Sequence, residues 1–488
     1  MIDALSSNRD RYPLIAIGII IGTLPLAMRP ILMMGLCAGT LVGLSILRNP
    51  RHGLLLVAAT IPLETAGQIG ALTAHLPLTV PKLLTLATLL AWLIHLALGR
   101  MNFRHLPWMY YLPGFLAAAG ASLIGAEETR SGLEAVLRFS NTIIFYFLIV
   151  QLLDTPVILK TCLILFLATS TLAASWSIVQ RFVPGSSFAF RYGWEEQDAR
   201  RSGVEQDIVE QHMVGIVERS SGLSPHSILL ALNICLLLAP LAAFMTNTRP
   251  TNTFLQCTWL AMLAVLLAAI VVTYARTGFV IVLFCFSLMT WRGLFSLTTT
   301  KVIAIVATLL IFILTVPDKY IDRVLSTRAY TTQSSSVSIR IDLAKAAFAQ
   351  FLDHPLLGVG YGNRYGIFDY FTSYRDKQHA VTPHNSFLQV AAQTGIIGLL
   401  ILMTFFWKTH RALCKAAAIF AAKGQYDLAR LGIALDISLL ALLFSGLAID
   451  LFDKGMAHAW LIIGTAGALA LLAERPAKKE SVLSMEPL

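Results

Sequence analysis

The sequence predicts an all-α, polytopic helical membrane protein with about 14 transmembrane helices and a long external loop that itself contains helices. Hydrophobic residues make up 56% of the 488 positions, and the mean hydropathy is +0.71. Only 13% of the residues are charged, against roughly 25% in soluble domains. A soluble fold of this length could not bury so much apolar surface, and disordered chains lack it. These observations exclude a soluble enzyme and a disordered protein.

The predicted spans follow from apolar runs that approach the roughly 20 residues needed to cross a bilayer. They lie at residues 13–28, 30–47, 53–68, 80–98, 107–124, 135–153, 157–180, 224–245, 256–275, 278–294, 301–317, 385–407, 432–450 and 456–473.

The basic residues predict the orientation of these spans. The net charge of +10 comes from 37 Lys and Arg against 27 Asp and Glu. With the N-terminus in the cytoplasm, 18 basic residues fall in cytoplasmic segments, six in short external turns and 13 in two long external loops. Because Lys and Arg concentrate in cytoplasmic loops, we expect both termini inside, with residues 408–430 as the strongest anchor. Topology therefore accounts for the positive charge, and we expect no nucleic-acid partner.

The spans and loops divide the chain into six predicted regions. These are N-terminal spans (1–180), a first long periplasmic loop (181–223), central spans (224–317), a large periplasmic loop (318–384), C-terminal spans (385–473) and a cytoplasmic tail (474–488). The two loops carry aromatic residues and glycines, so we expect them to be folded and functional rather than disordered. The six cysteines form no disulfide framework and no CxxC metal pattern.

The large loop contains a predicted amphipathic helix. Ser338 is its expected N-cap, Asp342 lies in its first turn, and His354-Pro355 ends it. Its apolar face is formed by Ile341, Ala344, Phe348 and Phe351. A flexible turn, Gly358-Val-Gly360-Tyr-Gly362, should follow. It is not a nucleotide-binding loop, because no strand precedes it and no helix opens there.

Polar residues within the predicted spans are few. Asn233, Asp436 and His95 are the main ones, and we interpret Asp436 and His95 as interface residues that reach water. The interior is therefore too apolar for an ion-coupled transporter. Polarity is concentrated in the outer loops, which favours chemistry at the outer membrane face.

His384 stands where the large loop meets the twelfth span, in the pattern His384-Asn385-x9-Gly395-x2-Gly398. A histidine that caps a span at the water boundary can accept a proton near neutral pH. It can equally be an ordinary interfacial residue. The two glycines would let a neighbouring helix approach closely.

This pattern resembles the signature of the O-antigen ligase and O-antigen polymerase family. Further segments with the same resemblance are Glu218-Arg219-Ser-Ser-Gly222, Tyr274-Ala-Arg276-Thr-Gly278, Ser338-Ile-Arg340-Ile-Asp-Leu and Asp353-His-Pro-Leu-Leu-Gly358-Val-Gly360. Together they cover residues 219–398 in order and on one predicted membrane side. The resemblance implies a multi-span inner-membrane enzyme that moves a glycan from an undecaprenyl-diphosphate carrier to an acceptor on the periplasmic face.

The resemblance also implies roles for particular residues. His384 would be the general base, and Arg219, Arg340 and Arg276 would bind the diphosphate, because guanidinium pairs with phosphate oxygens in bidentate fashion. The supporting residues would be Asn385, Gly395, Gly398 and Tyr361. Asp450 or Asp453 could orient His384 or an arginine, but we interpret both as external polar ends. His379 and His226 rank lower as site residues.

We therefore expect a glycosyltransferase without a cofactor. No carboxylate cluster with metal spacing occurs in the outer loops, so the enzyme should be metal-independent. A single displacement at the anomeric carbon should make it inverting. The family pattern favours an O-antigen ligase that uses lipid A–core as acceptor. The alternatives are a polymerase that joins two lipid-linked glycans and, more remotely, a protein O-oligosaccharyltransferase or a lipid-linked glycan flippase.

Overall fold

The computed structural model describes residues 30–63, 79–124, 126, 129–182, 222–224, 227–247, 252–273, 275–294, 336–363, 383–451 and 456–475. Within them are 13 α-helices, which confirm the predicted all-α fold class. Their bounds are α3 Pro30–Arg48, α4 Pro50–Thr60, α5 Val80–Ala97, α6 Tyr111–Ala121, α7 Thr129–Leu152, α8 Pro156–Phe182, α11 Ser227–Asn247, α12 Thr253–Val272, α13 Arg276–Trp291, α16 Ser336–Asp353, α17 Ser386–Ala422, α18 Tyr426–Ser445 and α19 Ala457–Glu474. Of two short 3-10 helices, η1 Ile61–Leu63 directly follows α4, and η3 Pro107–Tyr110 leads directly into α6.

Eight of the described helices are long and apolar enough to cross a membrane: α5, α7, α8, α11, α12, α17, α18 and α19. The predicted spans 13–28 and 301–317 lie outside the described residues. Two predicted spans are shorter than expected where they are described. The α4 and α6 helices have 11 residues each, or about 16 Å at 1.5 Å per residue, and the hydrocarbon core is about 30 Å thick.

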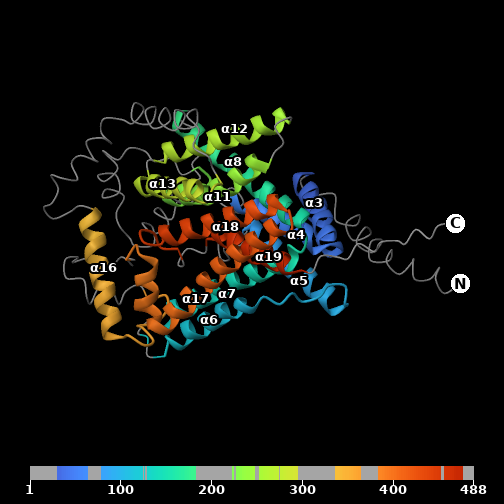
Figure 1. Ribbon diagram of the computed structural model, residues 1–488. Coiled ribbons are helices and arrows are strands. Elements are labelled where there is room, and N and C mark those ends of the chain that lie inside the picture. Colours follow the sequence, from blue (N-terminus) through green and yellow to red (C-terminus); the bar gives the residue numbers. More distant parts are fainter. Residues whose placement is uncertain are drawn as a thin grey trace, which may run out of the picture.

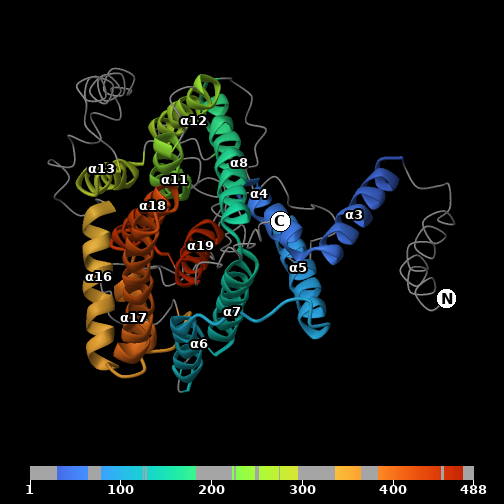
Figure 2. The same cartoon turned by 45° about the vertical axis from the view of Figure 1, so that its right-hand side comes forward.

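The C-terminal helices form the centre of the bundle together with α11. Of the most apolar 18-residue stretch of each helix, 78% of the residues are buried in α11 and α19 and 72% in α18. The corresponding share is 28% in α5 and in α12. Figures 1 and 2 place α3 and α5 on the side of the bundle away from α16, which stands beside α17.

Aromatic side chains and glycines hold α19 against α7. Tyr146 packs edge-on against Phe405 and Trp460, with ring centroids 5.6 and 6.2 Å away. A Cβ on Gly464 would lie 2.8 Å from Ile149, so only a glycine permits this close helix approach.

The α11 and α18 helices are antiparallel, and this arrangement defines the two ends of the bundle. The Asn247 side chain at the end of α11 donates to the Asp427 carbonyl at the start of α18, 3.2 Å away. Further along, the Ser438 hydroxyl donates to the Leu236 carbonyl at 2.7 Å. The start of α11 is therefore level with the end of α18. We call that level the His384 end, because Ser386 beside His384 bonds Gly446 at the end of α18. The opposite level is the basic end.

Cationic side chains tie the helices together at the basic end. Lys160 pairs with Asp427, and Arg51 pairs with Asp154. The Arg104 guanidinium donates to the carbonyls of Val150 and Leu153 at 2.7 and 2.9 Å, which caps the C-terminus of α7. Burial, and then the neighbouring Arg475, lower the pKa of Arg104 to about 10. It therefore remains charged at neutral pH.

Helical structure extends further at the basic end than the sequence predicts. The α17 helix continues to Ala422 and α18 begins at Tyr426, so most of the predicted cytoplasmic segment 408–430 is helical. Alanine dominates the segment from Ala412 to Ala422, and alanine has the highest helix propensity. The basic side chains of this segment are thus held in place by helices.

Candidate active site

His384 lies directly before α17 in a constrained backbone conformation. Its φ is 49°, and it is the sole residue other than glycine with a positive φ in the described part of the chain. Histidine is one of the few side chains that tolerate this left-handed region. The conformation turns the chain sharply into the first turn of α17.

The His384 imidazole faces a buried carboxylate. Its Nδ1 lies 3.3 Å from Oδ2 of Asp450, and the histidine side chain is 43% exposed against 5% for the aspartate. A carboxylate at Nδ1 fixes the ring orientation and leaves Nε2 to meet a reactant. Asp450 is therefore not the simple external polar end that the sequence suggests, because the fold buries it beside the imidazole.

The two residues that follow His384, Asn385 and Ser386, fix its position. The Asn385 side chain caps α17 by accepting from the backbone N–H groups of Phe387 and Leu388, both at 3.1 Å. The expected cap is thus supplied by Asn385 and not by His384. The Ser386 hydroxyl donates to the Ile449 carbonyl at 2.5 Å and accepts from the Leu451 N–H at 2.8 Å. These bonds bracket Asp450 and hold it against the start of α17.

Further along the chain, Gly395 interrupts α17. Its φ of 65° and ψ of −169° are non-helical, and a Cβ there would lie 2.1 Å from the Leu356 carbonyl oxygen. The freed backbone is paired, because the Ile396 N–H donates to the Pro355 carbonyl at 2.8 Å. The sequence predicts the close approach of a neighbouring helix at Gly395, whereas the segment that approaches is the turn after α16. The nearest contact of a Cβ on Gly398 would be Thr394 of α17 itself, 2.1 Å away.

The glycine-rich turn after α16 is closely packed rather than flexible as predicted. Gly358, Gly360 and Gly362 have φ values of 69°, 108° and 81°. A Cβ on Gly358 would lie 2.4 Å from the Gln393 backbone, and one on Gly362 would lie 2.5 Å from Ala135. The glycines are needed because the turn is wedged between the α17 break and the α6–α7 region.

Tyr361 in this turn belongs to the core. It is 5% exposed, and its ring packs edge-on against Phe115 and Phe139, with centroids 5.8 and 6.2 Å away. Its contacts indicate that it positions the turn.

The α16 helix differs in detail from the predicted loop helix. It begins at Ser336, so Ser338 lies inside the first turn and is not the N-cap, and Asp342 lies beyond that turn. It ends at Asp353, as His354-Pro355 predicts. The buried residues Leu343, Ala346 and Ala347 pack against Ala392 and Leu388 of α17. The predicted face is largely outside this contact.

Arg340 lies toward the same end of the bundle as His384. The α16 helix runs antiparallel to the first part of α17, because its C-terminal turn meets Gly395 and its middle packs against Ala392. Figure 1 shows the two segments side by side. Arg340 lies about 20 Å along α16 from that turn, and Asn385 lies about 15 Å along α17 from Gly395. Arg340 as a whole residue is half-buried.

The other two arginine-bearing segments are anchored on the first turns of α11. A Cβ on Gly222 would lie 3.4 Å from Leu230, and one on Gly278 would lie 2.8 Å from Ala231. The Gln180 side chain also holds Gly222 through bonds of 3.0 and 3.3 Å to its N–H and carbonyl. Gly222 and Gly278 therefore both pack on the part of α11 that lies at the His384 end.

Several predicted site residues cannot be placed. Arg219, His226, His379 and Asp453 lie outside the described residues, as does the side chain of Arg276, whose backbone begins α13.

Asp436 and His95, two of the three polar residues singled out in the predicted spans, have local partners. Asp436 is 1% exposed and bonds Arg292 at 2.9 Å and His410 at 2.6 Å, so it is a buried ion-pair residue and does not reach water as predicted. Cys414 lies 3.8 Å from the same carboxylate, and the His410–Cys414–Asp436 group has metal-like spacing. The Arg292 guanidinium already supplies the countercharge there. His95 bonds the Leu47 carbonyl at 2.9 Å as an interface residue.

The sequence did not single out Ser386, Gln393 or His458. Gln393 links the turn to α17, since its amide accepts from the Gly362 N–H at 3.2 Å and donates to the Asn363 carbonyl at 3.2 Å. Gln393 lies between His384 and Gly395 in the sequence motif. An amide side chain within this apolar run is the sequence signal that could have identified it. His458 lies at the start of the last predicted span.

The fold and site define a polytopic α-helical membrane protein with a histidine–aspartate pair at one end of its bundle. Residues 261–403 match the family model described as O-antigen ligase. The match extends from α12 to α17 and contains Arg340, His384 and Gly395. It confirms the predicted resemblance over that region and supports a membrane glycosyltransferase of the O-antigen ligase and polymerase type. No curated protein matches the chain significantly.

Proposed function

We propose that this protein is an O-antigen ligase of the bacterial inner membrane. It transfers a glycan from undecaprenyl diphosphate to a hydroxyl of lipid A–core on the periplasmic face, with both termini in the cytoplasm. The observation that carries the proposal is the His384–Asp450 contact of 3.3 Å, at the end of the bundle where Gly222 and Gly278 pack on α11.

His384 is the general base in this scheme. Its Nε2 takes the proton of the acceptor hydroxyl while the hydroxyl oxygen attacks the anomeric carbon of the donor sugar. The bond from that carbon to the diphosphate oxygen breaks, and undecaprenyl diphosphate leaves with the bonding electrons. One displacement inverts the anomeric configuration. Asp450 stabilises the imidazolium that forms and keeps Nε2 directed toward the acceptor.

The leaving diphosphate carries concentrated negative charge, which arginine suits. Arg219, Arg276 and Arg340 are the proposed ligands, since guanidinium is always charged and pairs with two phosphate oxygens at once. Arg340 lies in α16 about one turn from Ser336, where free backbone N–H groups add to anion binding. The guanidinium groups supply the countercharge in this scheme, so we expect chelation with EDTA to leave transfer unchanged.

The acceptor is tested with purified full-length protein in membranes that contain an undecaprenyl-diphosphate-linked glycan. Lipid A–core, a second lipid-linked glycan and a hydroxyl-bearing protein are supplied in separate reactions. We expect product on lipid A–core. Product on the second lipid-linked glycan identifies a polymerase, and product on protein identifies an O-oligosaccharyltransferase. Movement of the glycan lipid across the membrane without transfer identifies a flippase.

The role of His384 is tested by His384→Ala in the same assay. Loss of a general base lowers the rate by about 10²–10⁴-fold, and the KM for the donor should change little. His105→Ala is the matched control, since His105 is exposed at the basic end. Near-normal transfer by His384→Ala in a folded protein would remove the proposed base.

A further inference from the structure

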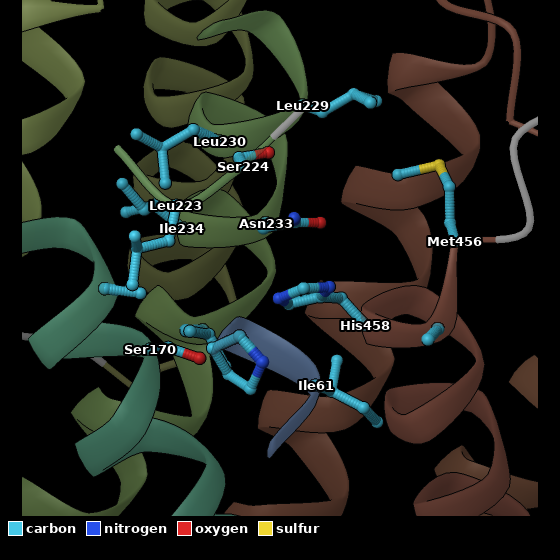
Figure 3. A pocket seen from close by; sticks show the side chains of 14 residues that line it. Ile61, Ser170, Leu223, Ser224, Leu229, Leu230, Asn233, Ile234, Met456 and His458 are labelled. Atoms are coloured by element: carbon cyan, nitrogen blue, oxygen red, sulfur yellow. The ribbon is translucent and has the colours of Figure 1, made fainter. Parts of the chain in front are cut away.

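A hollow lined in part by polar side chains lies between α8, α11, α19 and η1. Its volume is about 70 Å³, enough for several water molecules, since one needs roughly 10–15 Å³ by this measure. Figure 3 shows side chains from these elements around one space. His384 is not among its lining residues, so the hollow is distinct from the proposed catalytic centre.

Four polar side chains line this hollow, and three of them have an oxygen without a hydrogen-bond partner among the described residues. The buried oxygens Oγ of Ser170, Oγ of Ser224 and Oδ1 of Asn233 are unpaired there. Ser170 is 6% exposed. The fourth is His458, whose ring lies against Phe166 with centroids 5.4 Å apart. Figure 3 shows Asn233 and His458 pointing toward the same space from α11 and α19.

Such a lining requires an occupant. Buried polar groups in folded proteins are nearly always hydrogen-bonded, and polar side chains within membrane helices are rare and usually functional. None of the described lining residues is Asp, Glu, Lys or Arg, so the expected occupant is neutral. An amide, two hydroxyls and an imidazole together both donate and accept hydrogen bonds, as sugar hydroxyls do.

The walls and position of the hollow also fit a sugar. Leu229, Leu230 and Met456 supply apolar surface for the C–H groups of a sugar ring. Leu230 is the residue on which Gly222 packs, at the His384 end of α11. Met456 follows the same α18–α19 connection that carries Asp450. The hollow therefore lies in the half of the bundle that contains the histidine–aspartate pair.

We propose that this hollow is a subsite for the hydroxyl-bearing edge of one sugar ring, with Asn233, Ser170 and His458 as its hydrogen-bonding groups. The inference rests on the proposed glycan transfer and adds the place where a glycan is recognised. The sugar belongs to either the donor or the acceptor glycan, and the two sources differ in which KM depends on the subsite.

The test compares the full-length protein with its Asn233→Leu and Ser170→Ala variants. Asn233→Leu keeps the branched shape and the number of heavy atoms of the side chain and removes the amide. Ser175→Ala is the matched control for Ser170→Ala. Ser175 is also in α8, its hydroxyl donates to the Leu172 carbonyl at 2.7 Å, and it does not line the hollow. KM for the lipid-linked glycan and KM for lipid A–core are each measured with the other substrate saturating. Binding of undecaprenyl diphosphate without glycan is measured in parallel.

We expect one of the two KM values to rise roughly tenfold in both variants, the cost of about one lost hydrogen bond. Binding of bare undecaprenyl diphosphate and the Ser175→Ala values should stay within about twofold. A donor KM effect assigns the sugar to the donor, and an acceptor KM effect assigns it to the acceptor.

Two results would overturn the subsite. Unchanged KM values in both variants would mean that the hollow holds only water. An equal loss of affinity for bare undecaprenyl diphosphate would mean that the variants disturb the carrier site or the fold. If the unaltered protein transfers no glycan to any acceptor, the proposed function itself fails, and the subsite fails with it.

Discussion

At the residue scale, the histidine–aspartate pair combines a fixed carboxylate with an open imidazole. Asp450 is 4% exposed, and the backbone on both sides of it is bonded to Ser386. His384 keeps a positive φ of 49°, which costs about 1–2 kcal/mol for an L-residue. The Asn385 cap and the Ser386 bonds offset that cost. The local structure thus presents Nε2 to the reactants and holds Nδ1 on the carboxylate.

Asp450→Asn tests whether the carboxylate orients the base. The amide keeps the shape but cannot stabilise the imidazolium, so we expect kcat to fall about 10–100-fold, the loss typical of removing a carboxylate that orients a metal-binding histidine. The donor KM should stay unchanged, because Asp450 touches no substrate in this scheme. Steady-state transfer kinetics give both values.

The control is Asp427→Asn, which makes the same chemical change at the basic end, where Asp427 pairs with Lys160. This variant should keep its kcat. Partial recovery of kcat in Asp450→Glu would support orientation of the imidazole. An Asp450→Asn protein with unaltered kcat would show that the contact with His384 is incidental.

The role of Asp450 illustrates how far a single residue can be predicted. His384 was identified because its motif is contiguous in the sequence and lies at a span boundary. Asp450 looks like any acidic residue at the outer end of a span. Its contact depends on how α17 and α18 meet, which their separate apolar patterns do not specify.

At the element scale, the break in α17 decides how the loop helix docks. Gly395→Ala would place a Cβ 2.1 Å from the Leu356 carbonyl oxygen and force a left-handed φ of 65° on alanine. Both effects are destabilising, and a φ of 65° with a ψ of −169°, a backbone region that essentially only glycine occupies, costs about 1–3 kcal/mol by itself. We expect a lower thermal unfolding midpoint and reduced transfer, measured on detergent-purified protein.

Gly120→Ala is the matched control for that substitution. Gly120 lies in α6 with a helical backbone, and no atom outside its own helix backbone and neighbours lies within 4 Å of the added Cβ. Alanine there should leave the unfolding midpoint unchanged or raise it slightly. If Gly395→Ala behaves like this control, the α17 break does not hold the turn after α16.

The α16 helix also shows why one face was misassigned. The period of the sequence places Ile341 and Phe348 on an apolar face, yet they are 51% and 50% exposed. The contact with α17 uses Leu343 and two alanines instead. Small side chains allow helices to approach closely, so the face of α16 that carries the two alanines packs against α17. A helix that is apolar on two sides gives no sequence signal of which side is covered.

At the scale of the whole molecule, hydropathy predicted the architecture more reliably than it predicted individual contacts. Eight described helices match predicted spans in type and approximate position, because a bilayer requires long apolar helices irrespective of their partners. The short α4 and α6 helices end within predicted spans. Their lengths depend on proline positions and neighbouring packing, which a hydropathy average does not separate.

The two ends of the bundle also give a test of orientation. Arg130, at the start of α7, has a side chain that is 95% exposed, and the turn containing Tyr361 packs on neighbouring Gly132. This position therefore belongs to the His384 end. Lys415, in the basic segment of α17, is 64% exposed. Because basic segments stay in the cytoplasm, the two positions should face opposite compartments.

We expect Arg130→Cys and Lys415→Cys, in a chain whose six native cysteines are replaced by alanine, to differ in labelling by a membrane-impermeant maleimide. In intact spheroplasts Arg130→Cys should react and Lys415→Cys should not, while both should react after lysis. Glycan transfer by each variant confirms that the labelled protein is folded. Labelling of Lys415→Cys in intact spheroplasts would invert the topology. His384 would then face the cytoplasm, where a glycan carried on the outer leaflet cannot reach it.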